Sequence, residues 1–446
     1  MYKYQDRNTQ PLFQELFPFG GKLDKENRWL KVAEVIPWKE LEGVYAARHA
    51  RRGRPSKDSR LIVGLLAVKH MTGLSDEEVV ESVRENPYQQ AFCGFDQLVT
   101  DKILDPSTLT KQRKRLGKEF FEELEKKVYG VLVEKKILKA KGMYVDATVF
   151  PESIKYPNDV GLLNDVREWR VKRVKEYGEK AGEKIRTYCR KAKQGFLDFS
   201  RKKVKQKKAI RKAQKQMLQY VRRNPEQGSV LMGKLEKKGE VIGEKVRQRV
   251  KVAGQIYEQQ KTMHKEKVNR IKDRIVSFVR PYVRPIVRGK NGKEVEFGSK
   301  AGCVHVDGFV FLDHLEHRAF AEEEFIKKHV ETYKERFGKA PSSFTADKKY
   351  GTRDNREYLE KEGIRVGFKA LGRKRKDAER SSRWLRKKQR ERNRIEGDFG
   401  NGKEHYGLDR VLYSIENGSE IWVRLGLLGM NLKTALRKIQ LKPLAC

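Results

Sequence analysis

Three acidic residues occupy positions from which they could support chemistry on phosphate groups. Asp146 lies in the middle of an expected strand, KGMYVDATVF (141–150), on the face opposite the apolar side chains. Asp347 lies at the end of a short expected strand, and Glu396 lies on a long, basic expected helix. Carboxylates that converge in this way suit two magnesium ions about 4 Å apart, which can stabilise both oxygens of a displacement at phosphorus. Because the chain has 61 acidic residues, spacing alone does not single out this triple.

The elements around these residues predict a mixed α/β layout. The segment 295–315, VEFGSKAGCVHVDGFVFLDHL, predicts a hairpin that turns at Asp307-Gly308. AEEEFIKKHVETYKERFGK predicts an amphipathic helix that ends near Gly338. PSSFTADKKYG, RDNREYLEKEG, IRVGFKA and SSRWLRKKQRERNRIEGDFGNGK then predict a strand, a helix, a strand and a helix. The full order is strand, basic helical insertion, hairpin, helix, strand, helix, strand, helix.

The chain before the first strand predicts an arm or capping element over 1–45 and a helical domain over 46–140. Residues 58–71 have helical apolar spacing, and Asp58 or Ser59 could cap their start. Gly73 could end this helix and Ser75 could cap the next one, SDEEVVESVREN. A basic helix follows near DPSTLTKQRKRLG. This order is typical of helix-turn-helix modules, although a helical bundle with no DNA role fits the stretch equally well.

The composition favours a nucleic acid as the partner. The chain has 101 Lys and Arg against 61 Asp and Glu, a formal net charge of +40. So many positive charges repel one another in the folded state, and a large anionic partner would offset this repulsion. No stretch approaches the roughly 20 apolar residues that span a bilayer, and the opening residues lack the layout of a secretory signal. We therefore expect a cytoplasmic, nucleoid-associated protein with no membrane partner.

A long segment over 161–289 is especially basic and predicts a helical insertion. Residues 161–280 contain 36 Lys and Arg against 13 Asp and Glu, a net charge of +23. Residues 201–223 contain 11 basic residues and no acidic ones, with apolar positions at partial helical spacing. The segment is consistent with long helices lying on a polyanion, or with a solvated basic arm.

The candidate DNA-binding residues outside the Glu396 helix lie in three basic segments. They are Arg51, Arg52 and Arg54 in HARRGRP, Lys111 and Arg113 in the third expected helix, and Lys202, Lys203, Lys207 and Lys208 in the insertion. Each could instead be a solvated basic residue.

Cysteine and histidine patterns do not predict a zinc ribbon or a disulfide framework. The four cysteines are far apart and none belongs to a C-x-x-C pair, which fits a reducing cytoplasm. His314 and His317 lie close together in DHLEH and leave a metal role open, but polar residues at a strand end are the more frequent case. Asp313 is an alternative carboxylate ligand, whereas Asp398 would point to a different side of the helix from Glu396.

The stretch NRIEGDFGNGKEHYGLDR (393–410) resembles the carboxyl-terminal signature of bacterial insertion-sequence transposases of the Asp-Asp-Glu type. More narrowly, it is similar to the insertion-sequence-four and insertion-sequence-five groups. In that pattern an Arg precedes the catalytic Glu by four residues and a Lys follows it by seven, as Arg392, Glu396 and Lys403 do. The pattern's Tyr falls on Gln389, which puts a role for that Tyr in doubt and favours the insertion-sequence-five side.

Two further stretches and the helical domain extend this resemblance over roughly 46–150 and 280–435. YVDATVF resembles the first catalytic strand and TADKKYGTRDNREYL the second, with Asp146 and Asp347 as their catalytic residues. RRGRPSKDSRLIVGLLAVKHMTGLSDEEVVESVRENPYQQAFCG resembles the amino-terminal helical domain of these enzymes. Most of the basic insertion lies outside these ranges.

The resemblance implies a ribonuclease-H-like catalytic core, which we assign to 141–160 and 290–440. It implies two Mg²⁺ ions, with Mn²⁺ as a substitute, held by Asp146, Asp347 and Glu396. The implied substrates are double-stranded terminal inverted repeats and target DNA. Arg392 and Lys403 share the face of Glu396 and would grip the DNA backbone. A homodimer is expected because two DNA ends must be joined in one complex.

The sequence thus predicts a DNA transposase that cleaves the ends of an element and joins them to target DNA. Two alternatives remain open. One is a transposase-derived DNA-binding protein that no longer cuts, and the other is a ribonuclease-H-like nuclease that does not integrate DNA.

Overall fold

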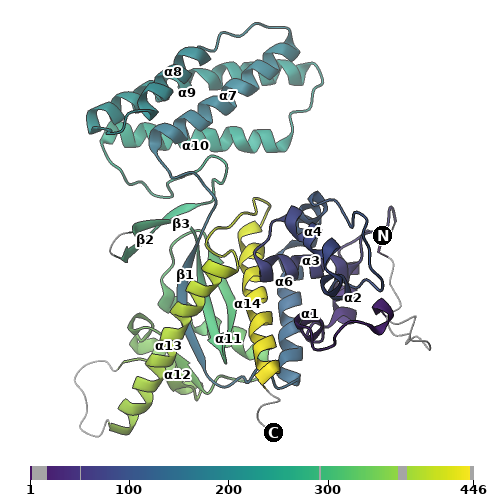
Figure 1. The fold of residues 1–446 in the computed structure, drawn as a ribbon. Coiled ribbons are helices and arrows are strands. Elements are labelled where there is room, and N and C mark those ends of the chain that lie inside the picture. The colour runs from purple at the N-terminus through teal and green to yellow at the C-terminus, as the bar shows by residue number, and fades with distance from the viewer. Residues whose placement is uncertain (3–17, 51, 291–292, 370–378, 442–446) are drawn as a thin grey trace. The chain divides into compact units, whose positions relative to one another are not determined.

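The chain forms two compact units, which the computed structural model describes over residues 1–2, 18–50, 52–290, 293–369 and 379–441 (Figure 1). Unit 1 comprises Met1–Glu152 and Ser299–Cys446, and unit 2 comprises Ser153–Gly298. The predicted insertion, 161–289, falls within unit 2.

The amino-terminal part of unit 1 is helical. Its elements are the 3₁₀ helix η2 (Pro18–Gly21) and the α-helices α1 (Arg28–Ala33), α2 (Trp38–Ala46), α3 (Ser59–Thr72), α4 (Asp76–Glu85), α5 (Pro87–Phe92) and α6 (Ser107–Glu134). The helix ends predicted from sequence are confirmed. Asp58 caps α3, Gly73 ends it in the left-handed region at φ 75°, and Ser75 forms a capping box with Glu78 at the start of α4. Trp29 of α1 and Tyr45 of α2, within the segment expected to be an arm, are buried in the same core as α3.

A mixed sheet forms the centre of unit 1, so the coarse α/β prediction is confirmed. Its strands are β1 (Met143–Pro151), β3 (Lys293–Val306), β4 (Phe309–Glu316), β5 (Ser343–Thr345) and β6 (Arg365–Val366). The order is β4-β3-β1-β5-β6, with β3 and β4 antiparallel and β1, β5 and β6 parallel. The predicted hairpin turns at Asp307 (φ 53°) and Gly308 (φ 88°), which match the left-handed conformation that such two-residue turns require.

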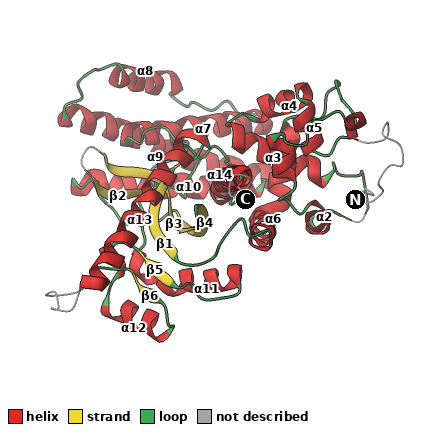
Figure 2. Cartoon of the chain, turned by 60° about the horizontal axis from the view of Figure 1, so that its bottom comes forward, coloured by secondary structure: helices red, strands yellow, loops and turns green. Residues whose placement is uncertain are grey.

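Helices pack against this sheet from several parts of the chain. They are α11 (Ile326–Phe337), α12 (Arg353–Lys361), α13 (Glu379–His405) and α14 (Gly418–Leu441), with the short 3₁₀ helices η3 (Glu322–Phe325) and η4 (Lys348–Tyr350). The helix α13 packs against β1 and β5, whereas α14 packs against β4, α3 and α6. Figure 2 shows β1, β3 and β4 between α13 and α14. The apolar α14 therefore joins the helical region to the sheet in one core.

Unit 2 is a helical bundle with a hairpin strand. Its elements are α7 (Asp159–Ala181), α8 (Cys189–Ser200), α9 (Lys207–Lys237), α10 (Glu244–Glu266) and β2 (Arg284–Lys290), which pairs antiparallel with β3 from Lys293 to Gly298. The helices α7 and α9 pack together, and their interface buries Leu163, Val166 and Val221. The basic segment thus has an apolar core of its own, which distinguishes it from a solvated arm.

A buried histidine in unit 1 predicts how stability depends on pH. Burial lowers the pKa of His70 on α3 to about 3, and the nearby charges of Lys69 and Arg113 lower it further. Since the folded-state pKa lies below the usual 6.5, the unfolded chain binds this proton more readily, and the stability contribution is lost as pH falls from about 6.5 towards 3. We expect His70→Gln to reduce the slope of unfolding free energy against pH by up to about 1.4 kcal/mol per unit.

Urea unfolding at several pH values between 7.5 and 4, on a grid of about half a unit, measures that slope. His405→Gln is the control because the His405 side chain is 57% exposed. Equal slopes for wild type and His70→Gln would contradict the prediction.

Candidate active site

Asp146 lies on β1, and Asp347 lies two residues beyond the end of β5, the parallel strand that pairs with β1. These parallel strands pair Met143 with Phe344 and Tyr144 with Thr345. The same register, continued two residues past the end of β5, would set Asp347 opposite Asp146, and residues opposite each other on neighbouring strands project to the same face. Asp347 caps η4 by accepting a hydrogen bond of 2.7 Å from the Lys348 amide.

The helix α13 brings two more predicted residues to this point. Ile395 of α13 is buried in the unit 1 core, and one turn earlier Arg392 donates to Asp146, with 3.0 Å between Nη1 and Oδ2. Burial raises the pKa of the Asp146 carboxyl above its ordinary value. The Arg392 charge opposes this rise, and the charges of Glu322 and Glu396 add to it. Glu396 is therefore close enough to act on Asp146 electrostatically, while its own side chain is exposed.

Gln389 fixes α13 against the strand ends. Its side-chain amide donates to the carbonyl oxygens of Ala346 at 3.3 Å and Gly367 at 2.6 Å. Ala346 directly precedes Asp347, so this contact positions the strand end relative to the helix. Gln389, which stands where the family pattern has a Tyr, thus holds α13 against the end of β5.

Two residues near the site were not predicted from the sequence. The hydroxyl of Tyr144 on β1 donates a hydrogen bond to Glu391 and accepts one of 2.8 Å from Lys388. These bonds give a second contact between β1 and α13. Glu322 of η3 pairs with Lys300 at 2.8 Å and raises the pKa of Asp146. Glu322 lies in a run of three glutamates, and nothing in its local sequence marks it as a neighbour of Asp146.

The chemistry of the donor set fits a hard divalent cation. Asp146, Asp347 and Glu396 offer carboxylate oxygens from β1, the end of β5 and α13. Across the described part of the chain, no three His, Cys, Asp or Glu side chains are grouped closely enough to hold a metal ion. Mg²⁺ is usually bound by only one or two carboxylates together with substrate phosphate oxygens, so its binding does not require three grouped protein ligands.

The candidate DNA-binding residues fall into different environments. Arg52, Arg54, Lys111, Lys202, Lys203, Lys207 and Lys208 are exposed, Lys403 is half-buried, and Arg51 lies outside the described residues. Arg113 is a correction: it is 2% exposed, donates to Asp76 at 3.0 Å and lies 4.1 Å from the centre of the Tyr413 ring. Its guanidinium is buried and already bonded to Asp76, so it is not available to contact DNA.

The other residues considered for the site have partners elsewhere. Asp313 is buried and accepts from His329 at 2.8 Å and Arg336 at 2.9 Å, which holds its pKa low despite burial. His314 stacks on Phe325, and His317 lies 3.2 Å from the Ser419 hydroxyl. Asp398 faces His305 at 3.4 Å, and burial raises its pKa to about 6.

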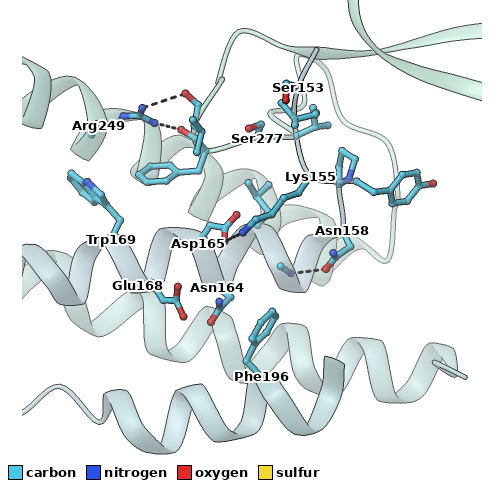
Figure 3. A pocket seen from close by; sticks show the side chains of 18 residues that line it. Ser153, Lys155, Asn158, Asn164, Asp165, Glu168, Trp169, Phe196, Arg249 and Ser277 are labelled. Atoms are coloured by element: carbon cyan, nitrogen blue, oxygen red, sulfur yellow. Dashed lines mark hydrogen bonds and ion pairs between the residues drawn. The ribbon is translucent and has the colours of Figure 1, made fainter. Parts of the chain in front are cut away.

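Unit 2 contains a pocket that is separate from these residues. It has a volume of about 680 Å³, and aromatic and polar side chains line it. Figure 3 shows Trp169 and Phe196 with Asp165, which pairs with Lys155 at 3.4 Å. None of the predicted site residues lines this pocket.

Within the part of the chain that the structure covers, no helix has the length and apolar character needed to cross a membrane.

Comparisons with known proteins identify the family of the chain. Residues 17–115 match the family model "Transposase domain (DUF772)", and residues 344–433 match "Transposase DDE domain". A Rhizobium meliloti protein named "Uncharacterized protein ORF8 in nfe locus" is 37% identical over 152 residues, which are 33% of this chain and 73% of that protein. No solved structure matches the chain. The second model spans Asp347, Arg392, Glu396 and Lys403. The chain belongs to the insertion-sequence transposases of the Asp-Asp-Glu type.

Proposed function

We propose that the protein binds the terminal inverted repeats of its element, cleaves the element ends and joins them to target DNA. The observation that carries this proposal is the meeting of β1, the end of β5 and α13, with Arg392 bonded to Asp146 at 3.0 Å. Cleavage and joining are both displacements at phosphorus with different oxygen nucleophiles, so one site can serve both steps.

Asp146, Asp347 and Glu396 would hold two Mg²⁺ ions, with Mn²⁺ as a substitute. When bound, the ions would neutralise charge on the phosphate and on the attacking and leaving oxygens. Ribonuclease-H-like topology is part of the proposal, and it is supported by the mixed sheet with parallel β1 and β5.

Arg392 has a distinct role in this proposal. Its Nη1 donates to Asp146, and its Nε is buried without a hydrogen-bond partner among the described residues. A guanidinium can bind phosphate through two parallel hydrogen bonds, so Arg392 can turn from Asp146 to the backbone beside the scissile bond. Lys403, seven residues after Glu396, would hold the same strand.

The remaining proposals concern partners. Arg52, Arg54, Lys111 and the four insertion lysines would contact the DNA backbone, because each presents an exposed charge that can displace counterions. The helical region around α3 and α4 would recognise the repeat. We further propose a homodimer at the joined ends, working in the cytoplasm on nucleoid DNA.

The test is cleavage and joining of a labelled duplex that carries the inverted repeat flanking the gene. We expect wild type to nick the repeat boundary with Mg²⁺ or Mn²⁺, to join the exposed 3′-hydroxyl to a plasmid, and to do neither in a chelator. A scrambled repeat is the control. Binding without cutting would favour a transposase-derived DNA-binding protein, and cutting without joining would favour a nuclease.

A further inference from the structure

The solvent-facing side of α13 carries a continuous row of basic side chains. Its members are exposed and follow one another at steps of three, one, three and four residues: Arg383, Arg386, Lys387, Arg390 and Arg394. Residues three and four apart lie on the same side of a helix, so the five charges form one stripe. Together with Glu391 they line an open groove of about 450 Å³.

The charge of this stripe is only partly offset within the protein. None of its five members forms an ion pair with any other residue that the structure describes. Glu391, the one acidic residue of the groove, is already paired with Lys388 at 2.9 Å and bonded to Tyr144. Lys387 acts electrostatically on Glu391, and Arg394 acts on Asp398. Five cations on about three turns of helix nevertheless outnumber these two carboxylates, an arrangement suited to a row of phosphates.

The stripe points away from the candidate active site. Arg390 and Arg392 are two residues apart, about 200° around the helix axis at 3.6 residues per turn. Arg392 faces Asp146, Gln389 bonds the carbonyl of Ala346, and Ile395 is 1% exposed in the core. A DNA segment whose scissile phosphate lies at Asp146 therefore meets one side of α13, and the basic stripe occupies the other.

We propose, on the basis of the function proposed above, that the α13 stripe binds the phosphate backbone of the target duplex. Joining requires a second duplex in the same complex as the cleaved end. Guanidinium contacts to phosphate carry no sequence information, which suits a target of varied sequence better than a fixed terminal repeat.

The test compares wild type with Arg386→Gln/Arg390→Gln, using a pre-cleaved end that exposes its 3′-hydroxyl and a plasmid target. We expect the target concentration for half-maximal joining to rise about tenfold or more, because each phosphate contact contributes strongly at low salt. Cleavage of the intact end should stay within about twofold. The salt slope for binding a repeat-free duplex should become shallower by about two, one for each lost contact.

The matched control is Lys339→Gln/Lys361→Gln, which removes two exposed charges from the same unit. It should join like wild type. If Arg386→Gln/Arg390→Gln reaches half-maximal joining at the wild-type target concentration, the proposal is wrong. It is also wrong if this variant loses binding and cleavage of the element end in parallel, because the stripe would then bind the element end. If wild type neither cleaves nor joins, the proposed function fails, and the salt slope alone then decides whether the stripe binds DNA.

Discussion

Replacing any one of Asp146, Asp347 or Glu396 by its amide should abolish DNA cleavage while leaving DNA binding intact. Each carboxylate is expected to hold a cation that neutralises charge on the reacting phosphate, a contribution of several kcal/mol. At about 1.4 kcal/mol per tenfold, a loss of about 4 kcal/mol slows cleavage by about 1,000-fold. Asn and Gln keep the shape of the side chain, so the fold should be preserved.

Single-turnover cleavage of the end duplex and a gel-shift assay on the same duplex separate chemistry from binding. Asp398→Asn is the matched control, because Asp398 lies on the same helix as Glu396 and faces His305. We expect this variant to cut within a fewfold of wild type. A triad variant that cuts at the wild-type rate would remove that residue from the site, and loss of both cutting and binding would indicate a damaged fold.

Local signals predicted the parts of the fold that depend on neighbouring residues. Asp58, Gly73 and Ser75 cap helices through contacts within four residues, and Asp307-Gly308 turns a hairpin through its own backbone angles. The helix α14 (Gly418–Leu441) was not predicted. It is buried along most of its length, so its apolar residues do not form a single stripe and its helical period is weak in the sequence.

The burial of Arg113 could have been predicted from its own helix. Arg113 follows Leu109 by four residues and precedes Leu116 by three, so it shares their buried face. The partner that makes this burial tolerable is Asp76, 37 residues earlier, and no local pattern connects the two.

The residues of the candidate site also fall into two groups: those that the sequence indicated and those that only the folded chain brings together. The resemblance to the family pattern around Glu396 assigned Arg392 and Lys403, which lie on the same helix as Glu396. The contacts of Gln389 with Ala346 and of Glu322 with Lys300 join segments 43 and 22 residues apart. The Gln389 contacts depend on how β5 pairs with β6, and the Glu322 contact depends on how η3 packs beside β3. Sequence periodicity alone determines neither.

A buried charge cluster in unit 1 gives the second large prediction. Arg424 of α14 is 8% exposed and donates to Glu125 at 2.6 Å, Glu122 at 3.0 Å and Glu420 at 2.8 Å. Burial raises the pKa of Glu125, and the Arg424 charge opposes the rise. The cluster joins α6 to α14, so it holds the helical region to the helix that packs on the sheet.

Arg424→Met should lower the free energy of unfolding by about 3–5 kcal/mol, because it leaves the Glu125 carboxylate buried without its counter-charge. Urea unfolding measures the loss. Arg84→Met, which removes a half-exposed arginine 2.6 Å from Glu81, should cost less than about 1 kcal/mol.

Adding Glu125→Gln to Arg424→Met should restore part of the stability, since the unpaired buried charge is then absent. The loss in the single variant should also shrink as pH falls, because a protonated Glu125 needs no counter-charge. A loss no larger than that of Arg84→Met would mean that the cluster does not hold α6 to α14.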